Sequence, residues 1–284
     1  MYPVTMADAT THPEAAIAAE MLAWPLRVLR VPLDVLDHIG AVIIFAISAI
    51  VRSFRRPFRF GIYVQTMEFV GVGSLGIVLL TGAFTGAVFA IQTSVAFGIF
   101  NAKSLIGGSV ALALILELAP TMGALMVAGR VGSAMCTELG TMRTTEQIDA
   151  LEILAVDPVH YLVAPRIIAC TLMMPLLTVG FNAIGLGGAY LVSTSMLGVD
   201  HAQFFSRVFD WVVPTDILCT LVKGTTFGFM IGAVASYSGF NATGGSRGVG
   251  RATTSTVVGS SVAVLVSDYV ITALWLILFP VHGK

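Results

Sequence analysis

The stretch FVGVGSLGIVLLTGAFTGAVFAIQTSVAF, at residues 69–97, contains no ionisable side chain. About 20 apolar residues in one helix are enough to cross the ~30 Å hydrocarbon core of a bilayer. Four further long apolar runs follow, at residues 105–127, 167–197, 217–240 and 252–281. The sequence therefore predicts an all-α integral membrane protein with about five transmembrane helices.

The composition agrees with this prediction. Of the 284 residues, 56% are hydrophobic and 11% are charged, whereas a soluble domain carries about 25% charged residues. The mean hydropathy is +0.91. A formal net charge of -1 offers no basic face, so we exclude nucleic acid as a partner. The three cysteines match no disulfide or zinc spacing and the five histidines lie outside the apolar runs, so no metal site is predicted.

The residues before the first long run divide into two segments. Residues 1–32 are mixed in character, and we expect them to form a cytoplasmic tail. Within residues 33–66, the apolar stretch 39–51 is too short to span a bilayer. We therefore expect an interfacial amphipathic helix and a basic linker here, followed by the transmembrane domain at residues 67–284.

The basic residues set the predicted orientation, because cytoplasmic loops are enriched in lysine and arginine. A cytoplasmic N-terminus places eleven arginines inside and only Lys103, Arg207 and Lys284 outside. An odd number of spans then places the C-terminus on the far side. The inside set is Arg27, Arg30, Arg52, Arg55, Arg56, Arg59, Arg130, Arg143, Arg166, Arg247 and Arg251.

Two glycine patterns occur in the first long run. Gly71, Gly73 and Gly76 have the spacing of a dinucleotide-binding fingerprint, but they lie inside a helical run with no acid about 20 positions on. No G-x-x-x-x-G-K-[ST] motif is present either, so any nucleotide must be bound by another chain. Gly82 and Gly86 have small-xxx-small spacing, which favours close helix packing over any chemical role.

Residues 129–165, between the second and third apolar runs, concentrate charge in a chain that otherwise avoids it. Thr144 with Gln147 fits a capping box, and Asp157-Pro158 fits a helix stop. Between them, apolar Ile148, Leu151 and Ala155 recur on one face while Glu146, Asp149 and Glu152 occupy others. This predicts a short amphipathic helix with an acidic surface, either a solvated connection or a docking surface.

Three ionisable residues, Glu117, Lys223 and Asp268, lie near the middles of predicted spans. A charge at mid-bilayer costs roughly 2.5 to 3.5 kcal/mol on insertion scales, so each should face a partner or a wet cavity. Charge balance allows Lys223 to pair with Asp268 or with Glu117. Our hypothesis is that Lys223 and Asp268 join the fourth and fifth spans, while Glu117 and Pro120 lie near a substrate cavity. A purely structural set of ion pairs is the alternative.

An ordered series of motifs resembles the MlaE/YrbE permease family of MCE-associated lipid ABC transporters, over the chain from about residue 60 to its end. The motifs are ELAP at residues 117–120, AGRVGS at 128–133, ELGTMR at 138–143, TEQIDALE at 145–152, VDP at 156–158 and GVGRATT at 248–254. Ser246-Arg247 departs from the family pattern, which more often has a small residue and an acid there.

The resemblance implies a function and a set of partners. It implies a permease subunit of an ATP-driven transporter that exchanges lipid, which we expect to be phospholipid, between the bacterial inner membrane and a periplasmic MCE-domain protein. Two permease copies, expected as a homodimer, would act with two cytoplasmic ATPases that bind ATP and Mg²⁺. The chain itself would hold no cofactor and catalyse no covalent reaction.

The resemblance also implies a role for the charged cytoplasmic segment, which in this family is the coupling helix region that docks on the ATPase. The residues expected to couple to the ATPase are Glu138, Gly140, Thr141, Arg143, Thr145, Glu146, Gln147, Asp149, Leu151 and Glu152.

Two other classes of function are weighed against the permease. An ion-coupled secondary transporter could use Glu117, Lys223 and Asp268 as its coupling site, but it predicts inverted repeats, and we find no convincing similarity between the two halves. A membrane-embedded enzyme needs a catalytic constellation at one depth. No histidine lies in the predicted spans and no nucleophile motif is recognisable, so this class fits worst.

Overall fold

The computed structural model describes residues 36–53 and 59–279, and within these ranges the chain is helical with no strand. The chain divides into two units, residues 1–45 and 46–284, and the second contains all of the long helices that begin after residue 59. The predicted tail at residues 1–32 lies outside the described residues. So do Arg55 and Arg56 of the predicted basic linker.

Six helices of the described chain are long and apolar enough to cross a membrane. Five of them overlap the five predicted runs over most of their length, which confirms the prediction of an all-α integral membrane protein. They are Phe60–Gly98, Lys103–Thr144, Val159–Ser195, Pro214–Phe240 and Gly245–Leu278.

The sixth helix, Leu36–Ser53, extends the short apolar stretch at residues 39–51 to 18 residues. At 1.5 Å per residue this helix is about 27 Å long, close to the thickness of the hydrocarbon core. Its length therefore no longer argues against a span, and its interfacial placement stays a prediction. At its end, Arg52 forms a 3.0 Å ion pair with Asp157.

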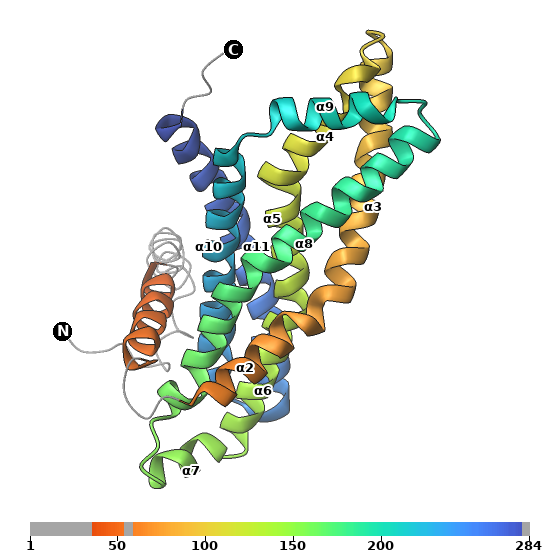
Figure 1. Ribbon diagram of the computed structural model, residues 1–284. Helices are drawn as coiled ribbons and strands as arrows, with labels where there is room; N and C mark the ends of the chain where they lie inside the picture. Colours follow the sequence, from red (N-terminus) through yellow and green to blue (C-terminus); the bar gives the residue numbers. More distant parts are fainter. Residues whose placement is uncertain (1–35, 54–58, 280–284) are drawn as a thin grey trace, which may run out of the picture. The chain divides into compact units, whose positions relative to one another are not determined.

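Several of the long helices are interrupted by short irregular turns (Figure 1). Gly71 separates α2 from α3, and two π-helical turns, Leu114–Leu118 and Ala128–Gly132, interrupt the second long helix. A third π-helical turn, Val159–Val163, precedes α8. The elements are α2 (Phe60–Val70), α3 (Val72–Gly98), the short 3₁₀ turn Lys103–Leu105, α4 (Ile106–Ala113), α5 (Ala119–Val127), α6 (Ser133–Thr144), α7 (Gln147–Ile153), α8 (Ala164–Ser195), α9 (His201–Trp211), α10 (Pro214–Phe240) and α11 (Gly245–Leu278).

Helix α8 packs against α3 on one side and α10 on the other. The α3 contact is made through glycines: a Cβ built on Gly86 would lie 1.9 Å from the carbonyl oxygen of Gly185. Helix α10 approaches as closely, since a Cβ on Gly228 would lie 2.3 Å from the Cys170 carbonyl oxygen. Close backbone approach of this kind holds helices together where lipid supplies no hydrophobic drive. The packing interpretation of Gly86 is thus supported.

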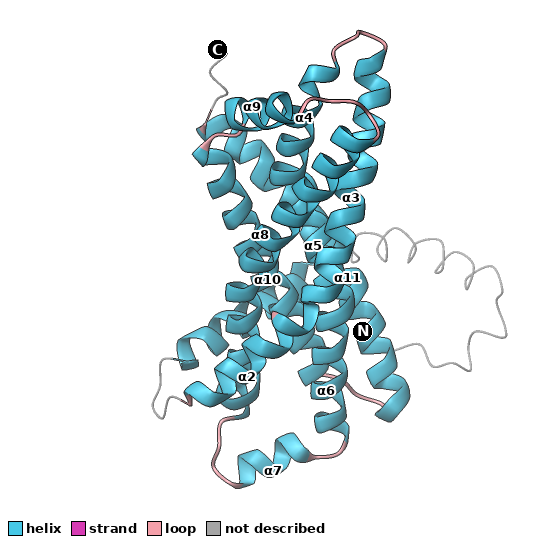
Figure 2. Cartoon of the chain, turned by 45° about the vertical axis from the view of Figure 1, so that its right-hand side comes forward, coloured by secondary structure: helices cyan, strands magenta, loops and turns pink. Residues whose placement is uncertain are grey.

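The two ends of this unit differ (Figure 2). Helix α7 lies beyond α6 and α2 at one end, and α9 lies across the other end, beside α4. Helix α6 continues to Thr144, so most of the first half of the predicted cytoplasmic segment belongs to the same long helix as the second apolar run. That helix, Lys103–Thr144, therefore connects the two ends.

Substitution of Gly86 by alanine is expected to destabilise the protein by about 1–3 kcal/mol, because the new Cβ meets backbone atoms that cannot move aside. The measurement is the thermal unfolding midpoint in detergent. Gly76→Ala on the same helix is the matched control, since nothing lies within 4 Å of its Cβ position. Equal midpoints for the two variants would contradict the packing role.

Candidate functional site

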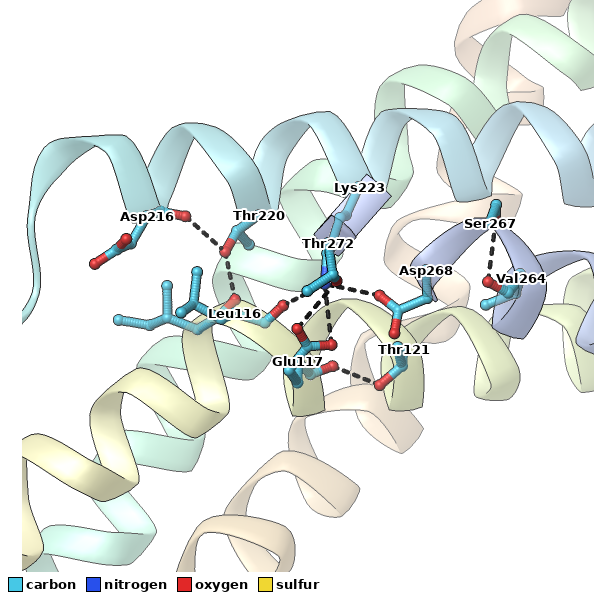
Figure 3. A network of polar contacts seen from close by, with 11 residues as sticks. Leu116, Glu117, Thr121, Asp216, Thr220, Lys223, Val264, Ser267, Asp268 and Thr272 are labelled. Carbon is cyan, nitrogen blue, oxygen red and sulfur yellow. Dashed lines mark hydrogen bonds and ion pairs between the residues drawn. The ribbon is translucent and has the colours of Figure 1, made fainter. Parts of the chain in front are cut away.

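The three intramembrane charges meet in one cluster (Figure 3). Lys223 on α10 is 1% exposed, and its Nζ lies 3.0 Å from Oε2 of Glu117 and 2.8 Å from Oδ1 of Asp268 on α11. Both contacts are ion pairs, and the Glu117 contact is also a hydrogen bond. Both pairings that the sequence left as alternatives are present together. The ammonium group thus connects three of the long helices.

Pro120 explains why this cluster forms where it does. In the π-helical turn Leu114–Leu118, the N–H of Ala119 donates to Leu114 instead of to Ile115. Proline has no N–H, so the carbonyl of Ile115 and that of Leu116 have no partner from position 120. Helix α10 supplies both: the Thr220 hydroxyl donates to Ile115, and Lys223 Nζ donates to Leu116 at 2.8 Å.

The two carboxyl groups have different surroundings. The Asp268 side chain is 17% exposed, while that of Glu117 is 43% exposed. Thr272, one turn beyond Asp268 on α11, donates to Oε1 of Glu117 at 3.1 Å. Glu117 is therefore held by α10 and α11 on one side while part of it reaches the surface of the unit. Its predicted place near a substrate path stays a prediction.

The depth of the cluster follows from the helix lengths. Lys223 lies nine positions after the start of α10, about 14 Å along the axis, and Asp268 lies ten positions before the end of α11, about 15 Å. Those two helix ends lie at the α9 end of the unit. If they mark the edge of the ~30 Å hydrocarbon core, the cluster lies near the bilayer midplane.

The charged segment holds the second group of predicted site residues. Ile148 of α7 is fully buried, with Leu139 and Leu162, and Leu151 packs against this small core. Several predicted coupling residues contact other residues of the chain: Arg143 pairs with Asp149 at 2.6 Å, Glu138 pairs with Arg166 at 2.9 Å, and Gly140 lies against Val249 and Ala242. Those exposed at the surface are Glu138, Thr141, Thr145, Glu146, Gln147 and Glu152.

The predicted boundaries of this helix are wrong at both ends. Thr144 is the last residue of α6, and α7 begins at Gln147 after Glu146, whose φ is 60°, so no capping box forms. A left-handed residue breaks the helical path there, which the residue pattern did not indicate. Asp157 does not stop α7, which ends at Ile153. Instead, its carboxylate accepts hydrogen bonds from the N–H groups of Val159 and His160 and caps the next helix.

Two apolar residues outside the predicted site, Ile153 and Leu154, are highly exposed in this segment. Ile153 is 86% exposed and Leu154 is 71% exposed, at the end of α7. Ala155 follows with a φ of 56°, so the chain turns sharply and leaves the pair projecting. The signal in the sequence was a second apolar pair on the polar side of the helix, where solvent alone would favour polar residues.

A bundle of long apolar helices with a buried ion cluster and a charged helix at one end defines a multi-pass membrane protein of the transport class. The profile of the family described as Permease MlaE matches residues 63–274, and the chain belongs to this family.

Individual relatives agree. A protein of Rickettsia bellii named probable ABC transporter permease protein is 43% identical over 84% of this chain and 92% of its own. The intermembrane phospholipid transport system permease protein MlaE of Haemophilus influenzae is 40% identical over 76% of this chain and 83% of its own. The Arabidopsis thaliana chloroplast protein TRIGALACTOSYLDIACYLGLYCEROL 1 is 36% identical over 82% of this chain and 67% of its own.

Lys223→Met is expected to destabilise the folded protein by about 3–5 kcal/mol, because it leaves two carboxyl groups near mid-bilayer without their cation. Unfolding in detergent measures the loss. The triple variant Lys223→Met, Glu117→Gln, Asp268→Asn removes all three charges and should recover most of the stability. If Lys223→Met alone kept wild-type stability, the cluster would have no role in holding the helices together.

Proposed function

We propose that this chain is the permease subunit of an ATP-driven transporter that exchanges phospholipid between the bacterial inner membrane and a periplasmic MCE-domain protein. Membership of the MlaE permease family supports the proposal, as do the names of the Rickettsia and Haemophilus relatives. The chain acts as a transport subunit, and a separate cytoplasmic ATPase binds ATP and Mg²⁺. A second copy of the permease completes the membrane part.

The single observation that carries the mechanism is the continuity of the helix Lys103–Thr144. It contains Glu117 of the ion cluster and ends in α6, two residues before α7 begins. Helix α6 also packs against α10 and α11, which carry the other two charges. A push on α7 therefore reaches the helices joined by Lys223 through this one helix and its two π-helical turns.

The surface that receives this push is proposed to be the exposed part of α7. Ile153 and Leu154 form an apolar projection, and Glu146 and Glu152 are the exposed acids of the same segment. Apolar side chains at the centre of an interface with charges around them are typical of protein contacts. Arg143 and Asp149 pair with each other and hold the segment in shape.

The proposed orientation places α7 in the cytoplasm. Arg59, Arg143, Arg166, Arg247 and Arg251 all lie on helix ends or loops at the α7 end of the unit. Lys103 and Arg207 lie at the α9 end. The excess of basic residues at the α7 end favours the cytoplasmic side for it and the periplasmic side for the end of α11.

Aspartate at both Ile153 and Leu154 is expected to weaken association with the cognate ATPase at least tenfold, because two apolar contacts are replaced by charges that must be desolvated. Co-purification and lipid exchange between vesicles are the measurements. Ile99→Asp with Phe100→Asp is the matched control, since these residues are 78% and 77% exposed at the opposite end. Lysine at Glu146 and Glu152 tests the acidic part of the surface separately.

If both α7 variants bound ATPase and moved lipid normally, the docking proposal would be wrong. Lipid or ion movement that required a proton or sodium gradient but no nucleotide would favour the secondary transporter instead, with Glu117 as its coupling group.

Cysteine labelling tests the orientation directly. Cys136, Cys170 and Cys219 are all buried, so an introduced cysteine at an exposed site gives a clean signal. Leu154→Cys is expected to react with an impermeant maleimide only after spheroplasts are opened, and Ile99→Cys in intact spheroplasts. The reverse pattern would place α7 in the periplasm and exclude a cytoplasmic ATPase contact there.

A further inference from the structure

Arg130 has no role in the proposed coupling and lies in the second π-helical turn, Ala128–Gly132. Its Nη1 donates to the Ser74 hydroxyl at 2.9 Å and, more weakly, to the carbonyl of Phe69 at 3.4 Å. The guanidinium carbon lies 5.5 Å from the centre of the Phe69 ring, within cation–π range. The side chain is thus fixed against the junction of α2 and α3.

Gly73 makes room for this arrangement. A Cβ at position 73 would lie 2.7 Å from Nη2 of Arg130, so any larger residue must displace the guanidinium. The glycine spacing that resembles a nucleotide fingerprint therefore has a different use here. It provides a flat backbone surface on which a planar cation lies.

The charge of Arg130 is not neutralised by a described residue. No aspartate or glutamate among residues 36–53 and 59–279 forms an ion pair with it. Both hydrogen bonds use Nη1, so Nε and Nη2 have no hydrogen-bond partner in the described part of the chain. A planar guanidinium with a free edge is suited to the oxygens of a phosphate group.

The depth of Arg130 indicates which phosphate is available. Arg130 lies 13 positions after Glu117 in the same long helix, about 20 Å along its axis. With the ion cluster near the midplane, this exceeds the ~15 Å half-thickness of the hydrocarbon core. Arg130 therefore lies at the depth of lipid headgroups, in the leaflet at the α7 end.

The surface around the cation is apolar. Phe69, Val72 and Leu75, from the segment that Arg130 contacts, are 40%, 60% and 39% exposed. A free phosphate ion would gain nothing from these side chains, whereas the acyl chains of a lipid would cover them. We propose that Arg130, held by Ser74 and Phe69 over Gly73, binds the phosphate group of a phospholipid in that leaflet. The site needs only a chain embedded in a bilayer, so it does not depend on the transport proposed above.

The test is binding of dioleoylphosphatidylglycerol to the purified full-length permease, measured by native mass spectrometry in detergent. Arg130→Gln should weaken binding about tenfold, because it removes charge-assisted hydrogen bonds. Arg130→Lys should weaken binding less, since lysine keeps the positive charge and loses only the paired N–H donors of the guanidinium. Gly73→Ala should weaken it too, by displacing the guanidinium while leaving every charge in place. Arg251→Gln is the control, because it removes an exposed arginine at the same end of the unit.

Two further probes separate the sources of the phosphate. Dioleoylglycerol has the same chains without a phosphate, and its binding should be equal in wild type and Arg130→Gln. Inorganic phosphate should neither bind measurably nor compete. Three results would each overturn the proposal. The first is an equal loss of lipid binding in Arg130→Gln and Arg251→Gln, and the second is no loss of lipid binding in Gly73→Ala. The third is inorganic phosphate that binds as tightly as the lipid. Failure here would leave ATPase docking and lipid exchange intact, so the two proposals can fail separately.

Discussion

The arrangement of the long helices depends on one ammonium group placed where a proline has freed backbone carbonyls. A lysine in hydrocarbon is costly unless every donor of its ammonium has an acceptor. Lys223 has two acceptors, a carbonyl of the π-helical turn and Glu117, and a second carboxylate, Asp268, in an ion pair. Because these come from two other helices, the cost of burying the charge becomes a reason for three helices to stay together. Pro120 leaves a backbone carbonyl without an N–H partner, and Lys223 donates to that carbonyl, so the two residues depend on each other.

This contact affects how force reaches the membrane. The helix that carries Glu117 extends without a loop from the α9 end to α6, and its π-helical turns are the places where its hydrogen bonding is already irregular. Such turns can shift register at lower cost than a regular helix. A displacement of α7 would therefore be absorbed at two defined levels, one beside the ion cluster and one beside Arg130, with the segments between them moving as rods.

Much of this was predictable from the sequence, for reasons that differ between features. The spans were predictable because apolar run length is fixed by bilayer thickness. Asp268 and Glu117 could be named as alternative partners of Lys223 because they are the carboxyl residues near the middles of predicted spans, but that both pair with it was not predicted. The boundaries of α7 were not predictable, because Glu146 adopts a left-handed conformation that its residue type does not require. The exposure of Ile153 and Leu154 was missed because helical periodicity assigns apolar residues to the core. The proposed lipid binding by Arg130 was not predicted, because an arginine near the end of a span indicates only the orientation of the chain in the membrane.

The contact between α3 and α8 places backbone against backbone, with Gly86 beside Gly185. On either side of this contact, side chains of one helix lie against glycines of the other, Phe181 against Gly82 and Leu79 against Gly180, so the two helices fit closely along their length. We expect α3 and α8 to move as one rigid body. Helix α11 is the opposite case, with only four buried residues along its length and its mid-depth tether at Asp268. A rearrangement of the bundle should therefore rotate α11 about the Asp268–Lys223 ion pair while α3 and α8 keep their positions relative to each other.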